Sequence, residues 1–311
     1  AYFASPAVHH DGFAMWDSKV IDWNAVKMGP KRDVVGELTE AMRRKGIKAG
    51  VSTHYGRHWC YYTFRPEFDT WDPANEGLYG KRRGDEDPPR PEDALHWEDV
   101  LNELVDQYQP DYIFVDGGVC DAHYSYNSEI YRDALRRVLA RYYNKSLEWN
   151  KGVVLSWKRD SLNQGEGVYD SEGAGLAGIP ERPWQAHIAV GGWSYNPNFN
   201  LKPVDSILRN FVDVVSRNGN LLLNIAPMAD GSLDKGHEKV LLQIGEWMRV
   251  NGEGITGSNP WKRFGSGKID RYKAYDKEAV RYTQKDGALY AWFVHWPKAG
   301  TVTLPEAASF D

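Results

Sequence analysis

The sequence predicts an α/β fold: a TIM-like (β/α) barrel, either incomplete at its N-terminus or closed by elements elsewhere, followed by a small antiparallel β-sandwich-like domain. Strand-like and helix-like segments alternate over residues 1–254, which favours a parallel sheet wrapped by helices. Over residues 255–311 the segments become short and strand-like, joined by turns such as Lys285-Asp286-Gly287, which is typical of an antiparallel sheet. The 311 residues suffice for one barrel-sized domain with a small appendage.

Local patterns predict the individual elements. Asp33 can cap a helix that keeps its apolar residues on one side, and Gly46 ends that helix. Residues 61–91 are polar and rich in Pro and Gly, and a loop of that size inside a compact domain is usually functional or partly disordered. The expected helices are 33–45, 91–107, 128–143, 203–217 and 234–250, and the expected strands are 2–8, 47–52, 112–115, 152–157, 168–169 leading to residue 172, 184–190, 220–225, 269–275, 279–283, 288–295 and 301–304.

Bulk properties exclude some functions and favour others. The net charge of −5 gives no reason to expect a nucleic-acid or membrane-surface partner. No apolar run reaches transmembrane length and no leader opens the chain, so secreted, periplasmic and cytoplasmic locations all stay open. Thirteen Trp and eighteen Tyr fit a carbohydrate-handling protein, because aromatic faces stack on the C–H faces of sugars, although large cores use them too. Cys60 and Cys120 do not make a disulfide framework, and their bonding state stays open.

One short segment ends a predicted strand on a carboxylate. Tyr112 to Val115 form an apolar run of the kind found in a strand buried on both faces, and Asp116 follows directly. In a β/α barrel such a position lies on the face where the chemistry is done. The alternative is an Asp that only caps the next turn.

Two histidine-rich segments follow earlier predicted strands. His9 and His10 are adjacent on extended backbone, so their rings should point to opposite sides and should not form a chelating pair. Neutral imidazoles can instead exchange hydrogen bonds with sugar hydroxyls, and no metal is predicted. The alternatives are buried histidines satisfied by backbone and a loop that only packs on the barrel rim. The candidate pocket residues from these segments are His9, His10, Trp16, His54, His58 and Trp59.

A second carboxylate follows a later strand. Glu172 and Asp116 are expected on strand ends that face a common mouth, and two carboxyl groups in different environments are what glycosidic cleavage needs. Glu166 and Asp170 are rival acids on the same segment. Further candidates for substrate binding are the cations Lys158 and Arg159 and the aromatic residues Trp193 and Tyr195.

Several of these segments, taken in order, resemble the α-L-fucosidases of glycoside hydrolase family 29. The resemblance covers nearly all of residues 1–265 and rests on multi-residue blocks rather than on one motif. It implies a retaining exo-glycosidase with a β/α barrel and a C-terminal β-sandwich, and no cofactor. The matching blocks are His9-His10-Asp11-Gly12-Phe13-Ala14-Met15-Trp16, residues 23–33, residues 110–117, Trp184-Gln185, Trp193-Ser194-Tyr195-Asn196 and residues 214–224.

The resemblance also implies residue roles and a substrate class. Asp116 matches the family's nucleophile, and Glu172 matches the more variable loop that carries the acid/base. His9, His10, His54 and Trp59 match positions that line the fucose pocket, and Trp193 an aromatic near the sugar's methyl group. The implied partner is a fucosylated oligosaccharide or glycoconjugate; a homo-oligomer stays open.

The chain departs from the family pattern in two places. Family members have an earlier barrel strand that supplies a further pocket histidine, and the sandwich of this chain looks cut short. A non-catalytic or weakly active fucose-binding protein is therefore an alternative. A metal-dependent hydrolase built on His9, His10, His54 and His58 is a third reading, which predicts that a chelator removes activity.

Overall fold

The computed structural model describes residues 1–117, 129–173, 175–269, 275–298, 300–302, 304 and 307. The chain divides into two compact units, residues 1–169 and 170–311. Cys120 lies outside the described residues, and the Sγ of Cys60 donates to the carbonyl oxygen of Arg57 at 3.4 Å. No helix in the described ranges combines the length and the apolar character needed to cross a membrane.

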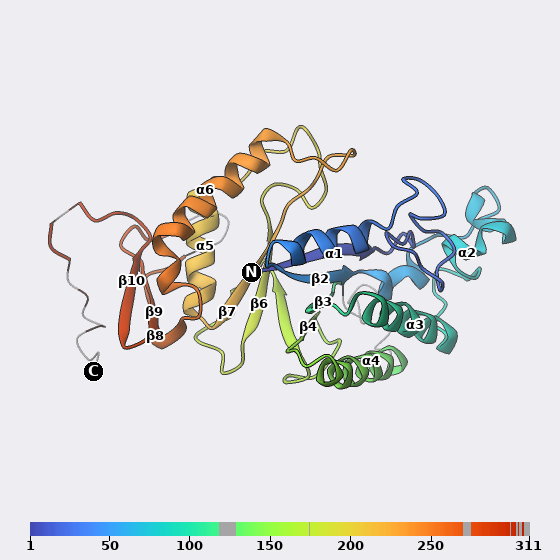
Figure 1. The fold of residues 1–311 in the computed structure, drawn as a ribbon, viewed down its shortest axis with the longest axis horizontal. Coiled ribbons are helices and arrows are strands. Elements are labelled where there is room, and N and C mark those ends of the chain that lie inside the picture. The colour runs from blue at the N-terminus through green and yellow to red at the C-terminus, as the bar shows by residue number, and fades with distance from the viewer. Residues whose placement is uncertain are drawn as a thin grey trace. The chain divides into compact units, whose positions relative to one another are not determined.

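The first unit is built on parallel strands that alternate with helices (Figure 1). The strands are hydrogen-bonded to one another in chain order, and every residue of the third strand is buried, as its apolar sequence predicts. Each strand ends at the same edge because neighbours are parallel. The elements are β1 (Tyr2–Val8), α1 (Val34–Arg44), β2 (Lys48–Thr53), α3 (Pro91–Tyr108), β3 (Tyr112–Val115), α4 (Glu129–Glu148) and β4 (Val154–Lys158).

Side chains fix where these helices begin and how they pack. Asp33 accepts a hydrogen bond from the backbone N–H of Gly36, which caps α1 as predicted. Helices α3 and α4 lie side by side (Figure 1), joined by an ion pair of 2.6 Å between Arg137 and Glu98. The buried side of α3 carries Trp97, Leu101 and Leu104 into the core of the unit.

The long polar stretch after β2 consists of short helical turns. A buried ion pair of 2.7 Å joins Arg83 to Asp93, and the guanidinium of Arg82 lies 4.1 Å from the ring centre of Trp71. These contacts hold a segment that the sequence predicts to be a long loop, functional or partly disordered. Its turns are η1 (Tyr55–Cys60), η2 (Asp69–Trp71), η3 (Pro73–Asn75) and α2 (Glu76–Tyr79).

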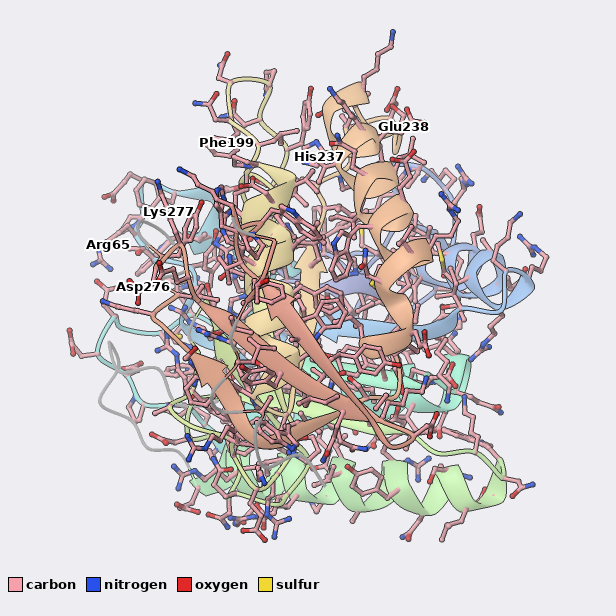
Figure 2. All side chains as sticks on the ribbon, turned by 90° about the vertical axis from the view of Figure 1, so that its left-hand side faces the viewer. Arg65, Phe199, His237, Glu238, Asp276 and Lys277 are labelled. Carbon is pink, nitrogen blue, oxygen red and sulfur yellow. The ribbon has the colours of Figure 1, made fainter. Side chains whose placement is uncertain are left out.

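The second unit continues the alternation of strands and helices. Strands β6 and β7 are parallel, and helices α5 and α6 lie side by side (Figure 1). Asp234 caps α6 by accepting from the backbone N–H groups of Gly236 and His237, and its other oxygen lies 2.8 Å from the His237 ring; His237 and Glu238 form part of the first turn (Figure 2). The elements are β5 (Val168–Glu172), whose first two residues belong to the first unit, β6 (Trp184–Ala189), α5 (Val204–Ser216), β7 (Gly219–Asn224), α6 (Lys235–Asn251) and η4 (Gly252–Gly254).

A small antiparallel sheet follows η4 in the order β10-β9-β8. Together with the alternating parallel strands, it confirms the predicted fold class; the boundary at residue 254 stays a prediction. Strand β8 was not predicted, because Pro260 and Gly265 interrupt its pattern, and both positions are tolerated at a sheet edge where the register shifts. The strands are β8 (Asn259–Ser266), β9 (Val280–Lys285) and β10 (Ala288–Phe293).

Two expected C-terminal strands have a different outcome. Ile269 and Tyr275 form an isolated antiparallel bridge, and residues 270–274 between them lie outside the described residues. Thr301, Val302 and Leu304 are not in a strand, so the prediction of a regular strand at 301–304 is wrong for these three residues.

Candidate active site

Asp116 lies directly after β3 and forms an ion pair with a residue of the next strand. The Nζ atom of Lys158, the last residue of β4, lies 2.6 Å from Oδ1 of Asp116. The Lys158 side chain is only 6% exposed, so this ammonium group is almost wholly removed from water. The same carboxylate oxygen accepts from the backbone N–H of Gly117 at 2.7 Å. The carboxylate therefore accepts from both of these donors, and its bond to the ammonium group is charge-assisted.

His54 follows β2 and lies beside this carboxylate-bearing turn. Its Nδ1 atom is 2.8 Å from Nε2 of His9, which follows β1. Gly117 has a φ of +83°, and a Cβ atom there would lie 1.8 Å from Nε2 of His54. Only glycine fits this position, because it combines a left-handed backbone with the close approach of an imidazole.

The rings of His9, His10 and His54 form one cluster. The centroids of the His9 and His10 rings are 4.0 Å apart, and His10 lies 5.1 Å from His54. The expectation that His9 and His10 point to opposite sides is wrong, because β1 ends at Val8 and the chain turns at the histidines, where the backbone N–H of Gly12 donates to the carbonyl oxygen of His9. The ring of Tyr61, which the sequence did not single out, lies 3.8 Å from that of His10 and extends the aromatic wall.

The imidazoles of this cluster are neutral at ordinary pH. Loss of hydration lowers the pKa of His54 to about 3, against the attraction of Asp116. Loss of hydration is also the main reason that the pKa of His10 is lowered to about 4, and the neighbouring His9 is the second. The pKa of His9 is also lowered, mainly by desolvation, although part of its side chain reaches solvent. Each ring can thus donate one hydrogen bond and accept another, which suits recognition of hydroxyl groups.

The same three histidines could also hold a metal ion. One nitrogen of each ring of His9, His10 and His54 lies within 4.8 Å of the other two. Imidazole is a common ligand for divalent transition metals, so the donor type fits. The ammonium of Lys158 beside Asp116 acts against it, since a fixed cation near this carboxylate competes with a second one. The absence of a metal stays a prediction, and chelation tests it.

Two other predicted pocket residues, His58 and Trp59, belong to η1. His58 is buried, its ring stacks on Tyr55 with centroids 4.6 Å apart, and its Nδ1 donates to the carbonyl oxygen of His10 at 3.0 Å. Burial lowers the pKa of His58 to about 4. Trp59 packs against the core with the guanidinium of Arg83 5.3 Å from its ring centre. His58 therefore holds the backbone at His10, whereas Trp59 contacts the core and Arg83.

Trp16 was expected to line the pocket, and the structure contradicts this. Its side chain is 0% exposed, and its indole N–H donates to Oε2 of Glu103 at 3.0 Å. Ser18 and the backbone N–H of Lys19 donate to the same carboxylate. In this motif Trp16 therefore serves core packing. It anchors the loop after β1 to Glu103 and has no surface left for a ligand.

The three candidate acids around β5 have different surroundings. Glu166 accepts from the backbone N–H of Asn163 at 2.9 Å and lies 3.5 Å from Arg136, and these contacts lower its pKa. Asp170 is buried and accepts from the side-chain amide of Gln185 at 2.6 Å. Glu172 is the exposed last residue of the strand. A general acid must hold a proton near neutral pH, which disfavours Glu166.

The remaining candidates lie on loops. Trp193 is 52% exposed, and its ring centroid lies 4.6 Å from that of His187 in β6. The sequence did not single out His187 as a site residue. The one signal that could have found it is a polar side chain inside a mostly apolar strand. Tyr195 is half-buried in the loop after β6. Arg159 is exposed directly after β4, with a left-handed φ of 56° that turns the chain away from the strand.

Comparison with known proteins gives consistent matches. A family model described as alpha-L-fucosidase matches residues 1–253. The tissue alpha-L-fucosidase of Rattus norvegicus is 32% identical over 97% of this chain and 61% of its own length, and that of Homo sapiens is 31% identical over 97% and 60%. The solved structure of Thermotoga maritima alpha-fucosidase in complex with fucose has a TM-score of 0.73 and 29% identity, covering 96% of this chain and 62% of that one.

The chain thus spans about three fifths of the length of these relatives. The match nevertheless includes every element from β1 to α6. Because the family model covers most of the chain and the relatives align with nearly all of it, the resemblance of its motifs is confirmed, and the chain belongs to the α-L-fucosidase family.

Proposed function

We propose that this protein hydrolyses terminal α-linked L-fucose from oligosaccharides or glycoconjugates with retention of configuration. The observation that carries the proposal is the pairing of Asp116 with Lys158 at 2.6 Å, beside the neutral His9–His10–His54 cluster. Membership of the α-L-fucosidase family supports the substrate class. A solved Thermotoga maritima relative in complex with a mechanism-based inhibitor, 29% identical, supports a route through a covalent intermediate.

In the first step Asp116 acts as the nucleophile. An oxygen of its carboxylate bonds to the anomeric carbon while the bond from that carbon to the leaving oxygen breaks. Glu172 gives its proton to the leaving oxygen, and a fucosyl-enzyme results. Lys158 positions the carboxylate of Asp116 by donating a hydrogen bond to its Oδ1.

In the second step water releases the sugar. Glu172, now ionised, takes a proton from water, the water oxygen bonds to the anomeric carbon, and the bond to Asp116 breaks. Two inversions give net retention. The neutral imidazoles of His9 and His10 hold the sugar hydroxyls throughout, and His54 orients the His9 ring through their 2.8 Å contact.

Chemical rescue tests the role of Asp116. Asp116→Gly should abolish hydrolysis of 4-nitrophenyl α-L-fucoside, and added azide should restore turnover and yield fucosyl azide of inverted configuration. Failure to form this azide in a folded variant contradicts the nucleophile assignment. A wild-type protein that binds fucose without releasing nitrophenol would favour the non-catalytic sugar-binding alternative.

Leaving-group dependence tests the role of Glu172. Glu172→Ala should slow substrates with a poor leaving group, such as 2′-fucosyllactose, more than a nitrophenyl fucoside, because nitrophenolate is a stable anion that departs without being protonated. The matched control is Glu166→Ala, whose carboxylate is held by Asn163 and Arg136. If Glu172→Ala loses equal activity on both substrates while Glu166→Ala loses activity mainly on 2′-fucosyllactose, the acid/base role belongs to Glu166 instead of Glu172.

A further inference from the structure

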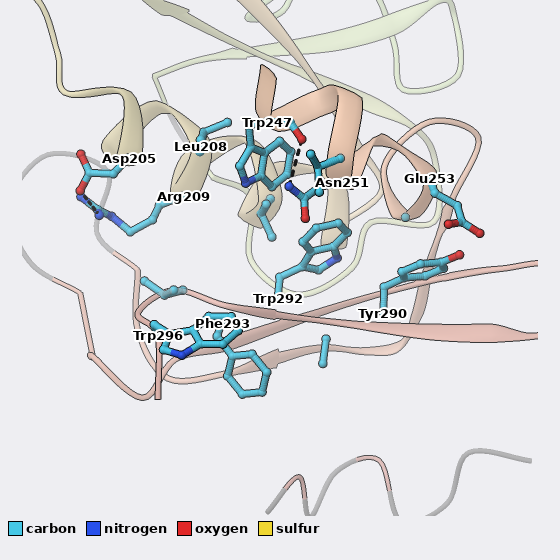
Figure 3. Close-up of a pocket in the computed structure, with 15 residues that line it drawn as sticks. Asp205, Leu208, Arg209, Trp247, Asn251, Glu253, Tyr290, Trp292, Phe293 and Trp296 are labelled. Atoms are coloured by element: carbon cyan, nitrogen blue, oxygen red, sulfur yellow. Dashed lines mark hydrogen bonds and ion pairs between the residues drawn. The ribbon is translucent and has the colours of Figure 1, made fainter. Parts of the chain in front are cut away.

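One pocket in the second unit involves none of the residues used above. Its volume is about 500 Å³, within the range of small-molecule sites. Side chains from α5, α6, η4 and β10 line it (Figure 3). All of these elements belong to residues 170–311, so the pocket is formed inside one unit.

Aromatic rings make up much of the wall. Tyr290 and Trp292 are two residues apart in β10 and so share one face of the strand, with ring centroids 6.3 Å apart and nearly parallel planes. Trp247 of α6 lies 5.6 Å from Trp292. Trp296 also lines the pocket, near Phe293 in Figure 3, and is 84% exposed, which is unusual for the largest apolar side chain.

The rings are held in place before any ligand arrives. The indole N–H of Trp292 donates to Oγ1 of Thr283 at 2.9 Å, and that hydroxyl donates in turn to the carbonyl oxygen of Gly254. A Cβ atom at Gly254 would lie 2.5 Å from Tyr290 and 2.7 Å from Trp292. Glycine therefore lets both rings lie directly on the backbone of η4, and binding needs little reordering.

The polar groups of the pocket are planar and carry no excess positive charge. Arg209 and Asp205 form an ion pair of 2.5 Å, Asn251 donates to the carbonyl oxygen of Trp247 at 2.9 Å, and Glu253 is exposed at the rim (Figure 3). Of the lining residues, two are acidic and one is basic. An anionic ligand would meet more negative than positive charge, whereas hydroxyl groups can bond to carboxylate, amide and guanidinium alike.

From these features we infer that the pocket is a second carbohydrate site, which binds a neutral oligosaccharide by stacking its pyranose rings on the aromatic wall, with Trp296 as the exposed platform. The C–H face of the sugar covers the indoles, and its hydroxyls bond to Asn251 and Glu253. The inference rests on the proposed function for the class of ligand, the neutral glycan that carries the fucose. Its role would be to hold such a glycan independently of cleavage.

Lactose is the probe, because it is a neutral disaccharide without fucose and need not enter a fucose pocket. Wild-type protein and Trp296→Ala are titrated with lactose by calorimetry, with saturation-transfer NMR to identify the bound sugar face. Trp296→Ala should weaken binding about three- to tenfold, as expected for one lost aromatic contact. The matched control is Trp71→Ala, which removes another partly exposed indole, 37% exposed and in the first unit.

The same preparations separate this inference from the proposed function. Both variants should hydrolyse 4-nitrophenyl α-L-fucoside at the wild-type rate. If the wild-type protein does not hydrolyse this substrate, the proposed function fails, and the lactose titration still decides whether the second site exists. Absence of lactose binding, or equal binding by Trp296→Ala and wild type, overturns the second site. Tighter binding of a heparin disaccharide than of lactose also overturns it, as does a concentration-dependent dimer that Trp296→Ala abolishes.

Discussion

Replacing Gly117 by alanine should damage both the stability and the activity of this protein. The residue has a φ of +83°, and its missing side chain leaves room for the ring of His54, which bonds to His9 at 2.8 Å. A Cβ atom would lie 1.8 Å from Nε2 of His54, far inside van der Waals contact. The imidazole or the turn that carries Asp116 must therefore move.

Two separable effects should lower the free energy of unfolding of Gly117→Ala. A left-handed backbone with a Cβ atom costs about 1–2 kcal/mol. Forcing a methyl group into occupied space costs about a further 1–3 kcal/mol. If relief displaces His54 or Asp116 by about 1 Å, kcat/KM should fall on the order of 100-fold.

Gly231→Ala is the matched control. Gly231 has a φ of +84°, and a Cβ atom there would meet nothing within 4 Å. This variant should lose only the stability that a left-handed backbone costs, and it should keep its activity. Urea unfolding and kcat/KM for 4-nitrophenyl α-L-fucoside measure both quantities. If Gly117→Ala matches Gly231→Ala in stability and keeps wild-type activity, the crowded geometry of the site is refuted.

Three further predictions test the site. Lys158→Met should lower kcat/KM about 10- to 150-fold, the equivalent of a charged hydrogen bond worth about 1.5–3 kcal/mol, and Lys158→Arg should restore part of it; equal rates for both variants would remove the positioning role. His58, with its pKa near 4 when folded, stays neutral between pH 7 and 5 while the unfolded imidazole gains a proton near pH 6.5, so folding stability should fall by about 2 kcal/mol over that range through this residue. Urea unfolding at pH 7 and pH 5 measures this loss of stability. In His58→Gln the loss between the two pH values should be smaller by that amount than in the wild type, and an equal loss in both proteins contradicts the assignment. Dialysis against EDTA should leave activity unchanged, whereas a loss that Zn²⁺ reverses would make His9, His10 and His54 metal ligands.

Features governed by neighbours in the sequence could be predicted well. The strand before Asp116 is recognisable because four apolar residues precede a carboxylate and a glycine, and β3 is buried along its whole length. The start of α1 could be placed because the Asp33 cap acts within three residues. The alternation of such segments then sufficed for the fold class.

Features governed by contacts distant in sequence could not be predicted. The burial of Trp16 depends on Glu103, which is 87 residues away, so its aromatic motif looked like a ligand contact. The convergence of His9 and His10 depends on β1 ending one residue before them. Strand β8 was missed because its partner β9 supplies the ladder that Pro260 and Gly265 weaken locally.

The parallel sheet explains why the chemistry is found where it is. His9, His54, Asp116 and Lys158 lie far apart in the sequence, yet each stands at or just after the end of one of four successive parallel strands. Parallel pairing puts these ends at one edge, so one residue per strand is enough to bring a carboxylate, an ammonium and imidazoles together. The register itself holds them, since the backbone N–H of Asp116 donates to the carbonyl of Thr53 and that of His54 to the carbonyl of Val8. The site is therefore as rigid as the sheet, and a slip of one strand by one residue would separate Asp116 from Lys158.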